Sequence, residues 1–319
     1  MNKDEVVKNK LVNFLHTVLL FSVLLTLMVF SGYLLAGSAG VLWAVIAGFF
    51  FLFFSPSLSP QLILKMYRAS IISIHDAPRL YHIIEELAHR AELPELPRLY
   101  YVPSNIMNAF SVGRKGNAAI GVTDGLLRRL DMRELTGVLA HEISHIRNND
   151  MRVMGFADII SRITGLFSNV GQVLLFLNIP LIIIGAVSIS WPAIFLLIMA
   201  PALSGLMQLA ISRTREFDAD LDAARLTGDP AGLASALQRM DYYESGIFER
   251  IFFPGRSDPN PSLLRTHPKT QDRVKRLLQL RQERRLEFVP EPEENFLFPP
   301  VMLQISRNPR WRRLSGLWY

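Results

Sequence analysis

Two long stretches without charged side chains constrain the fold of this chain more than any other feature. Residues 11–64 and 163–212 contain no Asp, Glu, Lys or Arg, although the 319 residues include 34 basic and 28 acidic ones. A helix that crosses a bilayer needs about 20 consecutive apolar residues. Each stretch is therefore long enough for two membrane helices joined by a short turn. The expected spans lie near 11–32, 38–56, 165–187 and 192–211.

Two other interpretations of the apolar stretches are weaker. Charge-free runs of this length are hard to place as buried helices in a soluble core. A cleaved signal peptide has an apolar region of roughly 7–15 residues, which is shorter than the run before the small residues LAGSAG at 35–40. A second apolar run also follows almost at once. The sequence thus predicts a mainly α-helical integral membrane protein.

The positions of the basic residues predict the orientation in the membrane. Basic residues flank both stretches, whereas the turns around 37–40 and 188–192 carry no charge. Because segments rich in Lys and Arg stay in the cytoplasm, we expect every polar segment and both termini there. Contact of these cations with lipid head groups accounts for the net charge of +6 without a nucleic-acid partner.

The polar segments predict an α+β domain. Residues 76–93 have the spacing of an amphipathic helix. Asp131 and Glu134 form a capping-box pattern that starts another helix. Three short runs rich in aromatic and β-branched residues predict a small sheet with a hairpin. These runs are 99–103, 109–113 and 118–123. Further helices are expected at 211–228, 229–245 and 267–288.

The segment HEISH at 141–145 follows the capping box on the same predicted helix. Its histidines, His141 and His145, are four residues apart, so they lie one turn apart on one face and can bind a single ion. Glu142 lies beside that ion without binding it, where it can take a proton from the attacking water. The alternative is a charged helix face with solvated histidines, but the apolar neighbours make burial without a metal costly. The absence of cysteine excludes a thiolate metal site and a disulfide scaffold.

A catalytic zinc usually has three protein ligands and one open position. Glu216 is the best third ligand, because the second apolar hairpin brings it back towards the histidines. Asp220 lies four residues later on the same face, where it can orient a histidine or pair with an arginine. The alternative for Glu216 is a surface carboxylate beside Arg213 and Arg215.

These motifs and their order resemble the HtpX family of membrane-embedded zinc metallopeptidases, which is related to the type I CAAX prenyl proteases. The resemblance covers nearly all of residues 1–285. It rests on NAF at 108–110, GVTDGLLRRLDMRELTGVLAHEISHIRNND at 121–150, REFDAD at 215–220 and THPKTQDRV at 266–274. It implies Zn²⁺ bound by His141, His145 and Glu216, with Glu142 as the general base.

The resemblance also implies roles that spacing alone does not indicate. His267 would stabilise the oxyanion of the tetrahedral intermediate, although from the residues alone it only opens a helix. Arg273 would pair with Asp220. An edge strand would pair with an extended substrate. Its residues are Asn108, Ala109 and Phe110.

The expected organisation is a catalytic domain interrupted by membrane hairpins. A hairpin at 1–64 precedes the first part of the domain at 65–162, which carries the edge strand and HEISH. A second hairpin at 163–212 precedes the second part at 213–288. The tail at 289–319 begins acidic and proline-rich and ends basic and aromatic. It fits either a disordered segment or a contact with the membrane surface.

The expected function is a zinc endopeptidase at the cytoplasmic face of a bacterial inner membrane. Its partners would be the lipid bilayer and polypeptides, and the resemblance implies clearance of misfolded membrane proteins. One alternative is a dedicated processing protease of the CAAX type, although four spans leave less room for an intramembrane chamber. Another is a zinc-stabilised membrane scaffold without catalysis, in which Glu142 would have no role.

Overall fold

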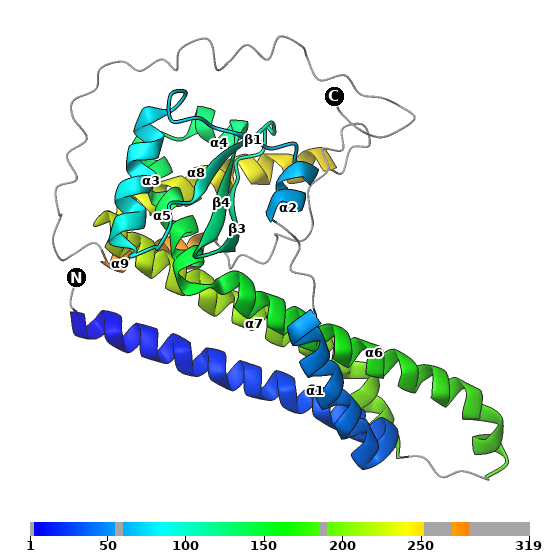
Figure 1. Ribbon diagram of the computed structural model, residues 1–319. Coiled ribbons are helices and arrows are strands. Elements are labelled where there is room, and N and C mark those ends of the chain that lie inside the picture. Colours follow the sequence, from blue (N-terminus) through cyan, green and yellow to red (C-terminus); the bar gives the residue numbers. More distant parts are fainter. Residues whose placement is uncertain (1–2, 55–59, 186–189, 252–269, 281–319) are drawn as a thin grey trace, which may run out of the picture.

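Long apolar helices form one end of the molecule, and a four-stranded sheet with its covering helices forms the other (Figure 1). The structure is a computed structural model that describes residues 3–54, 60–185, 190–251 and 270–280. His267 and the tail at 289–319 lie outside the described residues, so their predicted roles stay predictions.

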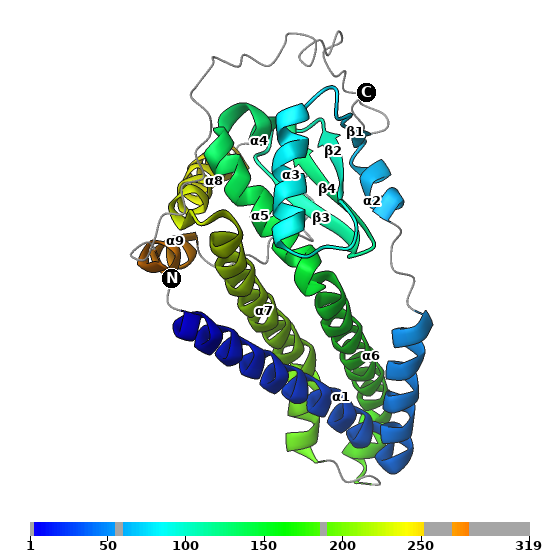
Figure 2. The ribbon, with the colours of Figure 1, turned by 60° about the vertical axis from the view of Figure 1, so that its left-hand side comes forward.

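Within the described ranges, three helices are long and apolar enough to cross a membrane. They are α1 (Lys3–Phe54), α6 (Asp150–Ile183) and α7 (Trp191–Thr227), and each contacts the other two (Figure 2). The two expected N-terminal spans fall on either side of a bend in α1, where the backbone leaves helical geometry at Ala36 and Gly37, and the described part of the second span ends at residue 54. The prediction of a mainly helical membrane protein with a small sheet is confirmed.

Glycines permit the bend in α1. Gly37 has a φ of +58°, a left-handed conformation that glycine adopts without steric cost. Gly32 and Gly40 touch across the bend, since a Cβ atom on Gly40 would lie 1.9 Å from the Gly32 carbonyl oxygen. The two arms of α1 therefore approach closely because neither residue has a side chain.

Two of the apolar helices continue directly into the polar part of the chain. The helix α6 begins at Asp150, and α7 runs unbroken through residue 211, where the sequence suggested two separate helices. Gly228 ends α7 in a left-handed conformation, as a C-terminal glycine cap should. The helix α7 thus runs without a break from the apolar bundle into the polar domain, and α6 begins two residues after the end of α5.

The sheet has the strand order β1-β2-β4-β3. The hairpin strands β3 and β4 are antiparallel, and β2 runs parallel to β4. All three coincide with the predicted runs, whereas β1 has only two residues and was not predicted. The strands are β1 (Ser70–Ile71), β2 (Arg98–Val102), β3 (Ala109–Arg114) and β4 (Asn117–Thr123). The strand β3 is therefore an edge strand.

Six shorter helices complete the described structure. They are α2 (Pro60–Met66), α3 (Pro78–Arg90), α4 (Asp124–Arg129), α5 (Met132–Asn148), α8 (Pro230–Ile251) and α9 (Thr270–Gln279). The predicted capping box at the start of α5 is confirmed: Asp131 accepts from the Glu134 amide at 2.8 Å, and Glu134 accepts from the Asp131 amide at 3.1 Å.

The main core lies where α3, α5 and α8 pack around the sheet. Leu99, Ile120, Leu139 and Ile143 are fully buried there. Gly137 allows α8 to lie directly on α5, because a Cβ atom at this position would come within 2.9 Å of the backbone of Leu233. This packing fixes the helix α5, which carries HEISH.

Candidate metal centre

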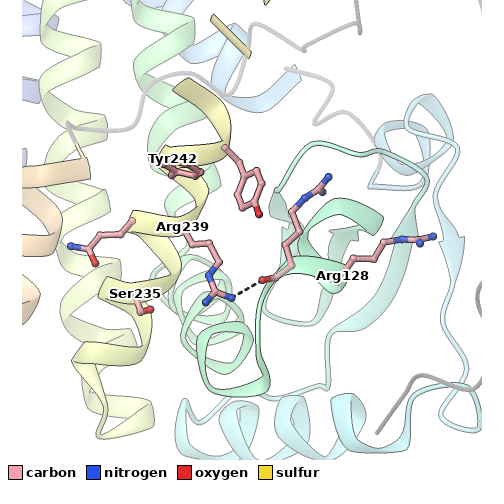
Figure 3. Close-up of a pocket in the computed structure, with 7 residues that line it drawn as sticks. Arg128, Ser235, Arg239 and Tyr242 are labelled. Carbon is pink, nitrogen blue, oxygen red and sulfur yellow. Dashed lines mark hydrogen bonds between the residues drawn. The ribbon is translucent and has the colours of Figure 1, made fainter. Parts of the chain in front are cut away.

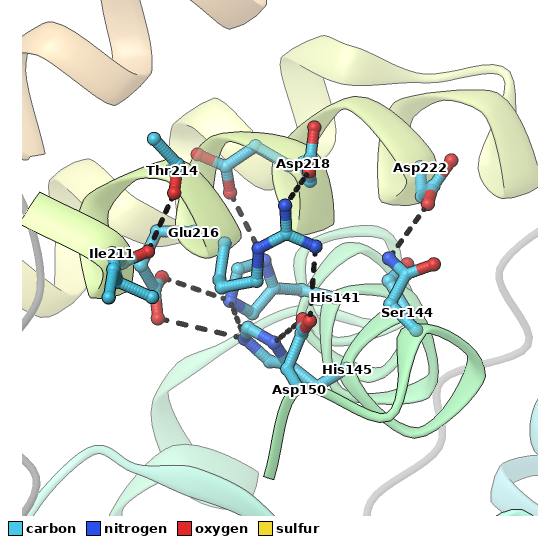
Figure 4. Close-up of polar contacts among 12 residues, drawn as sticks. His141, Ser144, His145, Asp150, Ile211, Thr214, Glu216, Asp218 and Asp222 are labelled. Atoms are coloured by element: carbon cyan, nitrogen blue, oxygen red, sulfur yellow. Dashed lines mark hydrogen bonds and ion pairs between the residues drawn. The ribbon is translucent and has the colours of Figure 1, made fainter. Parts of the chain in front are cut away.

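Three candidate ligands from α5 and α7 meet in the interior (Figure 4). His141 and His145 lie one turn apart on α5, and Glu216 lies on α7. The two Nε2 atoms are 3.1 Å apart. The carboxylate oxygens of Glu216 lie 3.4 Å from Nε2 of His141 and 3.6 Å from Nε2 of His145. Two helices that are distant in the sequence thus supply one compact donor set.

These separations fit one tetrahedral metal ion. Ligand atoms about 2.0–2.1 Å from a zinc ion are about 3.3–3.4 Å apart at tetrahedral angles. The observed separations of 3.1, 3.4 and 3.6 Å fall around that value. Two imidazole nitrogens that face each other can share at most one proton between them, so their lone pairs are available to a cation. The two nitrogens and one carboxylate oxygen suit a divalent ion, and they leave its fourth coordination position open.

Asp220 and Arg273 hold the outer side of His141. Nδ1 of His141 lies 3.1 Å from Oδ1 of Asp220. Arg273 donates to both oxygens of Asp220, at 2.6 and 2.8 Å, and its Nη1 lies 3.2 Å from Oε2 of Glu216. All four side chains are buried. A carboxylate on the outer nitrogen fixes the imidazole ring and leaves Nε2 directed at the ligand cluster.

Asp150 holds His145 in the same way. Its Oδ2 lies 2.8 Å from Nδ1 of His145, and the residue is 3% exposed. Asn149 has a φ of 53°, so the chain turns between α5 and α6 and returns the next carboxylate to the last turn of α5. The sequence analysis missed Asp150, because residues five apart do not face each other on a continuous helix. The run of two asparagines before it was the available signal for a left-handed helix end.

The electrostatics of the cluster favour a positive charge between the two rings. Burial and the Arg273 charge lower the pKa of His141, but hydrogen bonds to Asp220 and Glu216 outweigh them and raise it to about 9. Burial also lowers the pKa of His145, but its hydrogen bond to Asp150 and the charges of Glu216 and Glu142 raise it overall. A metal ion that binds here displaces protons from the histidines.

Glu142 lies next to His141 on α5 and is 8% exposed. Successive helix positions differ by about 100°, so Glu142 does not share the face that carries the two histidines. Its charge contributes to the raised pKa of His145.

The predicted substrate strand lies at the free edge of the sheet. Asn108 directly precedes β3, and its carbonyl accepts from the Thr123 amide at 3.0 Å, so its backbone faces β4. Backbone groups alternate in an antiparallel pair, so Ala109 and Ser111 direct their N–H and C=O groups to the free edge, while Phe110 faces β4. The strand β3 contacts α5 and α6. The edge therefore lies beside the two helices that meet after His145.

A depression of about 680 Å³ between α4 and α8 shares no residue with the metal cluster (Figure 3). Its arginines have partners in the fold. Arg128 pairs with Asp124 at 2.6 Å, and Arg239 pairs with Glu134 at 3.0 Å and donates to the Arg129 carbonyl at 2.8 Å. The two contacts of Arg239 hold α8 against the end of α4 and the start of α5. The lining residues are Arg128, Arg129, Ser235, Gln238, Arg239, Tyr242 and Tyr243.

Comparison with known protein families matches most of the chain. The sequence pattern of Peptidase family M48 matches residues 75–281, which include both histidines, Glu216 and Arg273. The chain belongs to peptidase family M48. It is therefore a metalloprotease, and its long apolar helices make it a membrane protein.

The relatives carry a more specific name. The chain is 38% identical over 292 residues to a Protease HtpX homolog from Sulfurihydrogenibium sp. (strain YO3AOP1), which covers 84% of this chain and 96% of the relative. It is 36% identical over 284 residues to a Protease HtpX homolog from Methylibium petroleiphilum (strain ATCC BAA-1232 / LMG 22953 / PM1), covering 83% and 97%. The expected membership of the HtpX family is confirmed.

The chain is also similar to solved structures. The crystal structure of S. mikatae Ste24p matches with a TM-score of 0.44 and 20% identity. The match covers 86% of this chain and 66% of Ste24p.

Proposed function

We propose that this M48 peptidase is a zinc-dependent endopeptidase that cleaves polypeptides at the cytoplasmic face of a bacterial inner membrane. One observation carries the proposal: His141, His145 and Glu216 form a largely buried donor set of tetrahedral size, and Glu142 follows His141 directly in the chain. In the proposed division, the catalytic domain comprises 65–162 and 213–288. The hairpins at 1–64 and 163–212 anchor it, and the basic flanks favour the cytoplasmic side.

In the proposed mechanism, His141, His145 and Glu216 hold the zinc ion. When bound, zinc polarises the scissile carbonyl and makes water a stronger acid. Glu142 takes a proton from the attacking water and passes it to the leaving amine. Asp220 and Asp150 accept from the outer ring nitrogens, which keeps each inner nitrogen free to bind.

The remaining roles concern the substrate. The free edge of β3 pairs with an extended substrate backbone through the outward-facing groups of Ala109 and Ser111. Such pairing uses backbone hydrogen bonds and depends little on the side chains of the substrate. It therefore suits unfolded segments of varied sequence, including those of misfolded membrane proteins. The family resemblance assigns oxyanion stabilisation to His267.

The test is hydrolysis of an unfolded model protein by the full-length chain in detergent with zinc supplied. We expect Glu142→Gln to keep one metal ion per chain and to lose hydrolysis, because only the base is removed. Glu86→Gln is the matched control, since the half-exposed Glu86 side chain on α3 pairs with Arg90 one turn away and belongs to no part of the candidate site. Metal content is measured by elemental analysis of the same samples.

Two outcomes would contradict the proposal. Hydrolysis by Glu142→Gln at the wild-type rate would exclude Glu142 as the base. If the wild type holds one metal ion per chain but produces no fragments, the chain acts on a dedicated substrate or serves as a metal-stabilised scaffold.

A further inference from the structure

Polar side chains on the first arm of α1 meet α7 in a regular antiparallel register. Lys10, Asn13 and Thr17 are spaced three and four residues apart, so they share one helix face. Nζ of Lys10 lies 2.6 Å from Oδ1 of Asp222. Asn13 donates to Oδ1 of Asp218 at 2.6 Å. The hydroxyl groups of Thr17 and Thr214 are 3.3 Å apart.

This polar seam, defined by Lys10, Asn13 and Thr17, lies at the start of the apolar stretch. A membrane anchor needs only apolar side chains, and a polar group in such a helix is costly unless a neighbour satisfies it. Asp222 has no exposed surface and also accepts from Asn148 at 3.0 Å, near the end of α5. The seam thus joins the first membrane helix to both helices that carry the ligands.

Arg215 extends the seam towards the metal cluster. Its Nη2 donates to the Thr17 hydroxyl at 2.8 Å and lies 3.0 Å from Oδ2 of Asp218. Its Nη1 lies 3.7 Å from Oδ1 of Asp150. The Thr17 hydroxyl donates to the Asn13 carbonyl at 2.8 Å, which leaves it oriented to accept from the guanidinium. Thr17 and Asp218 therefore hold Arg215 beside Asp150.

Asp150 needs this guanidinium. Its Oδ2 contacts His145, whereas its Oδ1 has no hydrogen-bond partner in the part of the chain that the structure describes. A buried carboxylate oxygen without a hydrogen bond is held in place by a nearby opposite charge. The Arg215 guanidinium lies 3.7 Å from this oxygen, so it helps to fix the Asp150 side chain where its other oxygen contacts His145.

We propose that Thr17 and Arg215 are positioning residues for the metal centre, and that the first arm of α1 supports catalysis in addition to anchoring the chain. The order of contacts is Thr17 to Arg215, Arg215 to Asp150, and Asp150 to His145. The inference rests on the proposed function, because it requires His145 to bind the catalytic metal.

The test compares three variants of the full-length protein in detergent, loaded with zinc. Thr17→Val keeps the shape of the side chain and removes the acceptor, and Thr17→Ser restores it. Thr26→Val is the matched control, because the exposed Thr26 hydroxyl donates only to the Ser22 carbonyl of its own helix. The measurements are the rate at which a chelator removes zinc, kcat and KM for an unfolded protein, and the thermal midpoint.

We expect Thr17→Val to lose zinc about 3–10 times faster than the wild type, somewhat less than the effect of losing a group that touches a ligand directly. Its kcat falls while KM stays within about twofold, because substrate pairing at β3 is untouched. Thr17→Ser and Thr26→Val match the wild type. If Thr17→Val is poorly produced, Arg215→Lys repeats the test. The lysine ammonium cannot bridge Thr17, Asp218 and Asp150 as the arginine guanidinium does.

Each contrary outcome separates this inference from the proposed function. A wild type that binds no zinc overturns the proposed function. A wild type that binds zinc, with Thr17→Val releasing it at the same rate, overturns only the coupling. A lowered thermal midpoint with an unchanged release rate assigns the seam to folding alone and also overturns the coupling.

Discussion

At His141 and His145, the outer nitrogen of each ring meets a carboxylate from a different helix. Asp220 lies on α7 and Asp150 opens α6, so each histidine is fixed from outside its own helix. A helix alone sets only the Cα positions of two ligands four residues apart. The orientation of the rings, and hence the meeting of the two Nε2 atoms, depends on these two acceptors.

Replacing Asp150 tests this dependence. We expect Asp150→Asn to lower the zinc affinity about 10–100-fold, because the amide is a weaker acceptor for the His145 ring. The measurement is a competition titration with a chelating dye. Asp158→Asn is the control on the same helix, since Asp158 is 43% exposed at the side chain and pairs only with Arg162. Equal affinities for the two variants would remove Asp150 from the support of the site.

At the scale of single elements, local patterns were sufficient to predict much of the structure. The capping box and the apolar spacing determine α5, and alternation with turn residues determines β3 and β4. The role of Asp150 could not be predicted, because it depends on the left-handed residue between α5 and α6. The seam on α1 could not be predicted, because it consists of contacts between residues far apart in the chain. His267 entered through family resemblance and lies outside the described residues.

The edge strand carries a prediction of its own. Ser111 directs its N–H group to the free edge, so Ser111→Pro removes a donor that the sheet does not use. We expect a fall in kcat/KM of about tenfold for an unfolded substrate, because one strand-pairing hydrogen bond is lost and the proline ring obstructs the edge. Ser111→Ala should leave kcat/KM unchanged, since the side chain takes no part in the pairing. A proline variant with wild-type kcat/KM would place the substrate elsewhere.

At the scale of the whole molecule, the two helices α6 and α7 join the membrane bundle to the candidate metal site. The helix α6 starts at Asp150, and α7 carries Glu216 without a break from the apolar bundle. The spacing of these two helices in the bundle therefore bears on the positions of Asp150, which contacts His145, and of Glu216. Gly171 lies at the contact between α6 and α7, since a Cβ atom there would lie 1.8 Å from a methyl carbon of Leu197 on α7, whose side chain would have to move.

A larger side chain at this position should disturb both the bundle and the metal centre. Gly171 lies 21 residues after Asp150 in the sequence, about 30 Å along the helix, so it has no direct contact with the ligands. We expect Gly171→Val to lower the thermal midpoint, because overpacking costs about 1–3 kcal/mol, and to accelerate zinc release. Gly165→Val is the control with the same change in helix propensity, as a Cβ atom at Gly165 meets nothing within 4 Å. If Gly171→Val loses stability while zinc release matches that of Gly165→Val, the bundle anchors the enzyme without setting the geometry of its metal site.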